Sequence, residues 1–209
     1  MRARTCFVSV VVALFVAGCG GGGSPSAPSS SSLTTLDRLA IARQVVTTAL
    51  GGVVSGSPVV KASGSVPLAG LTCQKTCAGA SCSVSCPIDE RLDCPSGGTA
   101  TDEGQITGTL DADLTGSAAL QAAQTFASCK PNADLTISGA PATTAVGDAR
   151  FVEGELADSQ TVQVTGSVSY VSASAGSGQC AVDVRVTFDR ALKGSARGSA
   201  CDQPVDVSF

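Results

Sequence analysis

Hydrophobic and polar residues alternate along several segments in the second half of the chain. The clearest segments are residues 106–115, 162–170, 180–188 and 205–209, in which an apolar residue or glycine stands at every second position and mostly polar residues lie between. This period of two predicts β-strands with one buried and one exposed face. Such strands are typical of an antiparallel sheet that is covered on a single side.

Further strands are predicted less clearly by the same pattern. Residues 135–139 and 149–156 are additional strand candidates, whereas the alanine-rich residues 117–128 suit a short helix as well as a strand. Glycines recur within the strand segments and indicate bends or bulges. We therefore expect a mainly β fold over residues 98–209, with a curved antiparallel sheet in the form of a sandwich or a half-barrel.

A helical period precedes this region, over residues 33–50. Thr34 or Thr35 is the expected N-cap, and Gly51 with Gly52 is the expected end. The apolar residues recur at helical spacing, and they are Leu36, Leu39, Ala40, Val46 and Leu50. The expected polar side consists of Arg38, Arg43, Gln44, Thr47 and Thr48. We expect this single amphipathic helix to pack on the sheet and not on a membrane surface.

The amino-terminal residues have the features of an export signal. Arg2 and Arg4 precede an apolar stretch, residues 6–17, which is too short to span a bilayer as a helix. The stretch ends in Val16-Ala17-Gly18-Cys19, which resembles the lipobox of bacterial lipoproteins. The resemblance covers residues 1–19. It implies that residues 1–18 are a signal peptide that is removed, and that Cys19 carries diacylglycerol and often an amide-linked acyl chain such as palmitate.

Residues 20–32 contain only Gly, Ser, Pro and Ala. This composition predicts a flexible tether, so residues 19–32 form the lipidated cysteine and its linker. The lipoprotein resemblance implies a location in the bacterial cell envelope, anchored to a membrane. Because Gly20 follows the cysteine instead of aspartate, similarity to enteric lipoproteins favours the outer membrane over the inner one. We expect the remaining residues, 33–209, to form a single domain.

The cysteines are the strongest chemical signal in this domain. The chain has ten cysteines, of which Cys6 leaves with the signal peptide and Cys19 takes the lipid. The other eight are Cys73, Cys77, Cys82, Cys86, Cys94, Cys129, Cys180 and Cys201. An even number of cysteines in an exported chain predicts disulfides, here up to four.

Spacing favours particular pairs among these cysteines. The cysteines of residues 73–86 lie symmetrically about Gly79-Ala80, so a hairpin turning there pairs Cys73 with Cys86 and Cys77 with Cys82. This defines a Cys-rich hairpin within residues 71–94. Two short helices with C-x3-C spacing would give the same pairs.

The other two pairs depend on strand parity and on elimination. Cys180 shares the apolar face of its segment, and Cys201 has the parity of Val205, so a hairpin turning near residues 190–192 brings the two cysteines together. Arg197 is out of phase with this strand, which requires a bulge or a later strand start. Cys94 and Cys129 pair by elimination.

A zinc site formed by the four cysteines of residues 73–86 is the rival interpretation. Zinc sites usually place two residues between paired cysteines, whereas three or four separate these. An oxidising compartment also competes for the thiols. We therefore favour disulfides and expect neither a metal nor a cofactor.

Composition excludes several classes of function. The chain has no histidine, so it cannot use a histidine base, a Ser-His-Asp triad or a histidine-ligated metal. Its net charge is −4, which becomes −6 when Arg2 and Arg4 are removed, and only 3% of its residues are aromatic. An acidic domain with few stacking side chains is not expected to bind nucleic acid.

Little catalytic chemistry remains. Asp111 and Asp113 would project from one strand face about 7 Å apart, a separation that suits two-carboxylate hydrolysis. Alternating Asp and Thr is more typical of a solvated face. The acids Asp89, Glu90 and Asp93 could bind calcium weakly. Ser–Lys catalysis stays open, although no spacing singles out Lys61, Lys75, Lys130 or Lys193.

Three hypotheses follow, in order of preference. The first is a non-enzymatic, lipid-anchored envelope protein with a role in structure or in contacts with an envelope protein. The second is a carrier of lipids or other amphiphiles, which requires a large empty cavity lined by Leu110, Val164 and Val184. The third is a hydrolase that uses Asp111 and Asp113, and it requires a concave pocket around them.

Overall fold

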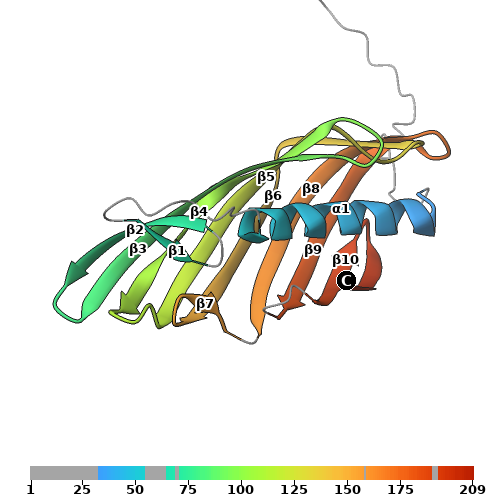
Figure 1. The fold of residues 1–209 in the computed structure, drawn as a ribbon. Coiled ribbons are helices and arrows are strands. Elements are labelled where there is room, and N and C mark those ends of the chain that lie inside the picture. The colour runs from blue at the N-terminus through green and yellow to red at the C-terminus, as the bar shows by residue number, and fades with distance from the viewer. Residues whose placement is uncertain (1–32, 55–64, 69–70, 158, 190–192) are drawn as a thin grey trace, which may run out of the picture.

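The fold is one sheet of strands with a single long helix. The computed structural model describes residues 33–54, 65–68, 71–157, 159–189 and 193–209 (Figure 1). Within them, α1 (Thr35–Val54) is followed by eleven strands in one sheet, which confirms a mainly β fold with an amino-terminal helix. The strands are β1 (Ser65–Leu68), β2 (Leu71–Ala78), β3 (Ser81–Asp93), β4 (Thr99–Asp111), β5 (Gly116–Asn132), β6 (Leu135–Val152), β7 (Glu155–Leu156), β8 (Gln160–Ser172), β9 (Gly176–Phe188), β10 (Gly194–Ala200) and β11 (Gln203–Ser208).

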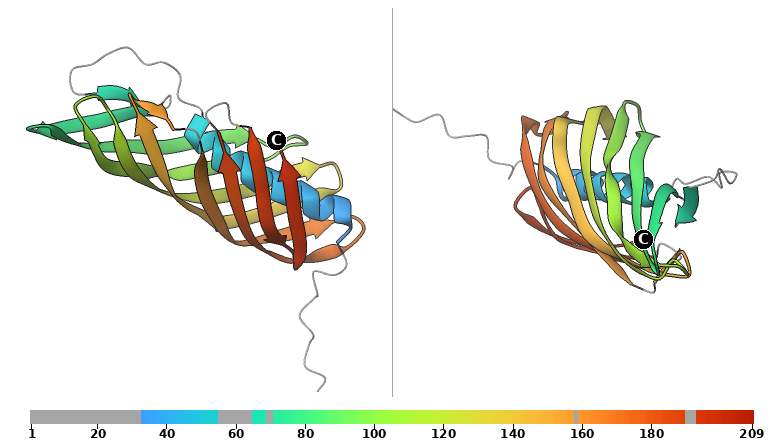
Figure 2. Two further views of the ribbon diagram at one scale, coloured as in Figure 1. Left: turned by 90° about the horizontal axis from the view of Figure 1, so that it is seen from below. Right: turned by 90° about the vertical axis from the view of Figure 1, so that its left-hand side faces the viewer.

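The strands form an antiparallel meander. They are hydrogen-bonded in chain order from β1 to β6 and from β8 to β11, with β6 next to β8 and the short β7 paired with β6 alone. All of these pairs are antiparallel. The single sheet curves around α1, which lies across the strands on the concave face (Figure 2). The predicted curved antiparallel sheet is therefore confirmed, in its half-barrel form.

Glycines and bulges produce the curvature, as the sequence predicts. A Cβ atom on Gly104 would lie 2.2 Å from the carbonyl oxygen of Gln121, so only glycine allows β4 and β5 to approach so closely there. The pairing of β6 with β8 shifts register between Ser138 and Thr143, and the pairing of β5 with β6 shifts around Cys129. Such bulges bend long strands, which lets one sheet wrap around a helix.

Three strand predictions need correction at their bounds. The segment at 106–115 ends as a strand at Asp111, and a turn follows. The candidates at 135–139 and 149–156 belong to one long strand, β6, and the second of them contains a turn before β7. The ambiguous residues 117–128 are all strand, within β5, because their pairing with β4 and β6 satisfies the backbone where alanine side chains express no preference.

The helix begins as predicted but ends later. Thr34 is the N-cap, since its Oγ1 accepts a hydrogen bond from the backbone N–H of Asp37 at 3.1 Å. The prediction that Gly51 and Gly52 end the helix is wrong, because α1 continues to Val54. A Cβ atom on Gly51 would lie 2.6 Å from Cδ1 of Leu92 in β3. This glycine therefore serves the close packing of α1 on the sheet.

The predicted sides of the helix are also partly wrong. Leu36, expected in the core, is 76% exposed, whereas Gln44 and Thr48, expected on the polar side, are 6% and 0% exposed. The apolar residues of α1 that are buried are Ile41, Ala42, Val45, Val46 and Ala49. A concave sheet encloses a wider arc of a helix than a flat one, so residues beside the apolar stripe are buried too.

Candidate functional site

Four disulfides cross-link the domain, and they join the pairs predicted by symmetry, by strand parity and by elimination. Their Cα–Cα distances are 4.1 Å for Cys73–Cys86, 3.9 Å for Cys77–Cys82, 5.5 Å for Cys94–Cys129 and 4.3 Å for Cys180–Cys201. The first two are nested in the β2–β3 hairpin, which turns at Gly79-Ala80. All eight domain cysteines are therefore oxidised, which leaves no thiolate among them for a metal site.

The position of Cys201 differs from the prediction. It lies in the turn between β10 and β11 with φ of 52°, not on the final strand, and its N–H donates to the carbonyl oxygen of Ala181 at 2.8 Å. The hairpin of β9 and β10 brings it to Cys180, and residues 190–192 lie outside the described part. Because β11 starts only at Gln203, the phase conflict at Arg197 disappears.

The Cys94–Cys129 disulfide fixes one rim of the half-barrel beside α1. Cys94 N–H donates to the carbonyl oxygen of Gly98, and Lys130 N–H donates to that of Gly97 at 2.8 Å. These bonds and the disulfide tie the connection between β3 and β4 to the end of β5. The rim is therefore built as a rigid unit.

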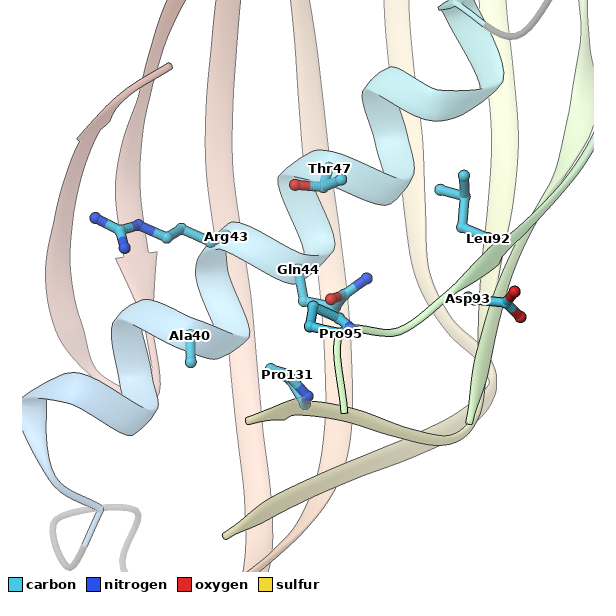
Figure 3. A pocket seen from close by; sticks show the side chains of 8 residues that line it. All are labelled: Ala40, Arg43, Gln44, Thr47, Leu92, Asp93, Pro95 and Pro131. Carbon is cyan, nitrogen blue, oxygen red and sulfur yellow. The ribbon is translucent and has the colours of Figure 1, made fainter. Parts of the chain in front are cut away.

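A cleft of about 320 Å³ lies between α1 and this rim (Figure 3). Its lining residues are Ala40, Arg43, Gln44, Thr47, Leu92, Asp93, Pro95 and Pro131. The charged ends of Arg43 and Asp93 point away from each other, and Pro95 and Pro131 face the helix between them. The middle of the cleft is thus uncharged, so it offers no obvious means of orienting an ionic substrate.

A row of polar side chains lies buried on the concave face beneath α1. The polar row consists of Asp102 of β4, Gln124 of β5 and Thr143 of β6, which are directly opposite one another in register. Their exposed fractions are 1%, 0% and 2%. Thr143 Oγ1 donates to Gln124 Oε1, and Gln124 Nε2 donates to the carbonyl oxygen of Val45 at 3.2 Å. The polar row therefore binds the backbone of α1 directly.

Asp102 is the chemically unusual member of the polar row. Its Oδ1 is buried without a hydrogen-bond partner among the described residues, and Glu90 stands directly opposite on β3. Burial raises the pKa of Asp102 to about 7, and the negative charge of Glu90 adds to the rise. This carboxyl can therefore exchange a proton near neutral pH, and its depth keeps it from contact with a substrate.

Sequence reasoning missed Asp102, although the chain carries a signal for it. Asp102 has the same parity as Ile106 and Leu110, which face the core from β4. An acidic residue on the apolar side of an alternating segment is uncommon, because burying a charge without a partner is costly. The prediction began the segment at residue 106 and so did not include it.

The amino-terminal end of α1 has a second polar contact with the sheet. Asp37 is 7% exposed, and its two carboxylate oxygens accept hydrogen bonds from Asn132 Nδ2 and Ser172 Oγ, each at 3.4 Å. These partners lie in β5 and β8. The helix is therefore held by polar contacts at its start and above the polar row, with apolar packing between.

The carboxylates considered for hydrolysis have a structural role instead. Asp111 ends β4, and its Oδ1 accepts hydrogen bonds from the N–H groups of Asp113 at 3.0 Å and Thr115 at 2.9 Å. Asp113 lies in the turn, so the expected projection of both acids from one strand face is wrong. The Asp111 carboxylate closes this turn, as an aspartate commonly does.

The other acidic candidates lie on a strand that separates them. Within β3, Asp89 and Asp93 are exposed, whereas Glu90 is half-buried beside Asp102 on the opposite face. Among the described residues, no group of three or more acidic or cysteine side chains is arranged to hold a metal ion.

The proposed anchor lies outside the described residues. Cys19 and the residues before it fall within residues 1–32, and Lys61 falls within residues 55–64, so all of them lie outside the part of the chain that the structure describes. In the part of the chain that the structure describes, no helix is both long and apolar enough to cross a membrane.

Comparisons with known proteins leave the function to be argued from the molecule itself. No protein-family model matches the chain. No curated protein and no solved structure is significantly similar to it.

Proposed function

We propose that this chain is a lipid-anchored protein of the bacterial cell envelope that acts in structure or in contacts with another envelope protein, without catalysis. The anchor is Cys19, on the strength of Val16-Ala17-Gly18-Cys19 and the polar tether after it. The outer membrane is the preferred location, because Gly20 follows the cysteine. The four disulfides fit an oxidising compartment.

One observation carries this choice among the three hypotheses: α1 fills the concave face. Leu110, Val164 and Val184, which would line the cavity of a carrier, are at most 2% exposed and belong to one continuous core. A filled core counts against an amphiphile carrier. The turn-closing role of Asp111 counts against a carboxylate hydrolase.

The convex face is the surface that remains for contacts. No described element packs on it (Figure 2). Its exposed residues are mostly uncharged and polar, with scattered charges. One row crosses six neighbouring strands and consists of Gln105, Gln121, Val146, Gln163, Arg185 and Arg197. We call these six residues the convex row. The amide and guanidinium groups of the convex row are at the surface, where they can form hydrogen bonds with a protein partner.

The anchor is tested by labelling cells with an alkyne fatty acid. Wild type should take up label, and so should the matched control Cys6→Ala, because this cysteine lies in the part that is removed. Cys19→Ala should take up none. Label that persists in Cys19→Ala, or that is absent from wild type, would refute the lipid anchor.

The contact role is tested by photo-cross-linking in intact cells. A photoreactive residue at Gln121 or Arg185, both in the convex row, should give a discrete adduct of one size. The same residue at Thr76, exposed near the tip of the β2–β3 hairpin, is the control and should give none. Absence of any adduct from the convex row would contradict a role in protein contacts through this face.

A further inference from the structure

The helix is seated directly above the carboxyl of Asp102. On one side of Asp102, Gln124 of β5 binds the carbonyl oxygen of Val45. On the other side, Leu92 of β3 packs against Gly51. Leu92 and Asp102 both face the concave side, since Leu92 is opposite Ala100 in register. The carboxyl therefore lies under the part of α1 between these two contacts.

We propose that Asp102 controls how firmly α1 is docked: the helix is held on the concave face while this carboxyl carries a proton, and it loosens when the proton leaves. A neutral carboxyl without a partner costs less beneath a helix than an ionised one, which needs hydrogen-bond donors or water. Gln124, its neighbour in the polar row, donates from Nε2 to the carbonyl oxygen of Val45, and Asp102 Oδ1 has no hydrogen-bond partner among the described residues. Lifting the carboxyl-terminal half of α1 would admit water to the ionised group.

The other charges near this site do not supply a compensating cation among the described residues. Glu90 faces Asp102 from β3 and opposes its ionisation, and the neighbour on β5, Gln124, is neutral. On α1, the charged residues lie elsewhere. Asp37 binds Asn132 and Ser172, Arg38 lies against β10 and β11, and Arg43 lines the cleft with its charged end turned away from Asp93.

Hydrogen exchange of the full-length protein, read by mass spectrometry, tests this proposal. Peptides covering α1 are compared with peptides of β8 and β9 between pH 6 and 8, after correction for intrinsic exchange rates. With a midpoint near pH 7, the protection of α1 should fall about tenfold over this range. Protection of β8 and β9 should stay higher than that of α1 at every pH, because an opening that lifts α1 leaves the hydrogen bonds between these two strands in place.

Two variants separate docking from general effects. Asp102→Asn should make the protection of α1 independent of pH, whereas Glu103→Gln should keep the wild-type dependence. Glu103 is the exposed neighbour on the opposite face and is the matched control. If Asp102→Asn does not fold, the wild-type exchange together with an NMR titration of labelled aspartate side chains still decides the question.

Three outcomes would overturn the proposal. One is protection of α1 that does not change with pH in wild type. Another is the same change in Asp102→Asn as in wild type. The third is protection of α1 equal to that of β8 and β9 at every pH, which would mean that α1 opens only when the whole fold unfolds and not by undocking.

Discussion

The concave and convex faces of the sheet come from the same strands, yet they differ in almost every physical respect. Inward residues such as Ile106, Val164 and Val184 are 2%, 0% and 0% exposed and belong to one continuous core with the buried residues of α1. Outward residues such as Gln121 and Arg185 remain exposed, and no described element covers them. One face therefore stabilises the fold, and the other is available for contacts.

The comparison also shows where the fold departs from a simple apolar core. The concave face contains an unpartnered carboxyl, Asp102, and hydrogen bonds from the polar row to the helix. A buried carboxyl without a partner lowers stability, most of all when it is ionised. The difference between the faces thus singles out Asp102, the buried carboxyl through which we propose that protonation sets the docking of α1.

The largest expected effect is on the pH dependence of stability. The pKa of Asp102 is higher in the folded protein than in the unfolded chain, so the folded protein binds this proton more tightly. The stabilisation of the fold by this proton is complete below about pH 4 and is lost as the pH rises through 7. The rise from 3.8 to about 7 corresponds to about 4 kcal/mol. Urea unfolding should show Asp102→Asn to be more stable than wild type at pH 8 but not at pH 4. Parallel pH curves for the two proteins would contradict the assignment, and Glu103→Gln on the convex face is the control.

Removal of a disulfide should lower the free energy of unfolding, and the loss should be larger for the disulfide that closes the longer loop. Cys94–Cys129 closes a loop of 35 residues at the rim of the concave face, and its replacement by two alanines should cost about 4 kcal/mol in the chain-entropy model. Cys77–Cys82 closes only 5 residues in the β2–β3 hairpin and should cost about 2 kcal/mol. Thermal unfolding of the two double variants gives the order. Equal losses would show that loop closure does not govern these disulfides.

A smaller effect is expected from truncating one side chain on each face of β4. Ile106→Ala leaves a cavity in the buried core on the concave side and should lower the free energy of unfolding by about 3 kcal/mol. Thr107→Ala, the next residue on the convex face, should change it by about 0.5 kcal/mol or less. Urea titrations of both variants measure the contrast. Similar losses at the two positions would mean that something covers the convex face.

Alternation alone predicted much of the sheet. The segment at 180–188 is β9 in its expected phase, with Cys180 and Val184 inward, and the symmetry about Gly79-Ala80 predicted the β2–β3 hairpin. The phase of β9 was predictable because a strand with one covered face must place its apolar residues at a period of two. The spacing of the cysteines then added long-range information that alternation lacks.

Other features could not be read in this way. The buried arc of α1 depends on the curvature of a sheet formed by distant residues, so the burial of Gln44 and Thr48 was not visible in a helical period. The turn at Asp111 depends on a side chain that binds the backbone, which alternation does not report. Asp102 became meaningful only when register placed it between Glu90 and Gln124.

Native mass spectrometry of the mature full-length protein, purified in mild detergent, tests the closed concave face most directly. We expect the mass of residues 19–209 with the covalent lipid on Cys19, less eight hydrogens lost to four disulfides, and no bound small molecule. An amphiphile retained non-covalently at one per chain would contradict it, because such a ligand requires space that α1 now occupies.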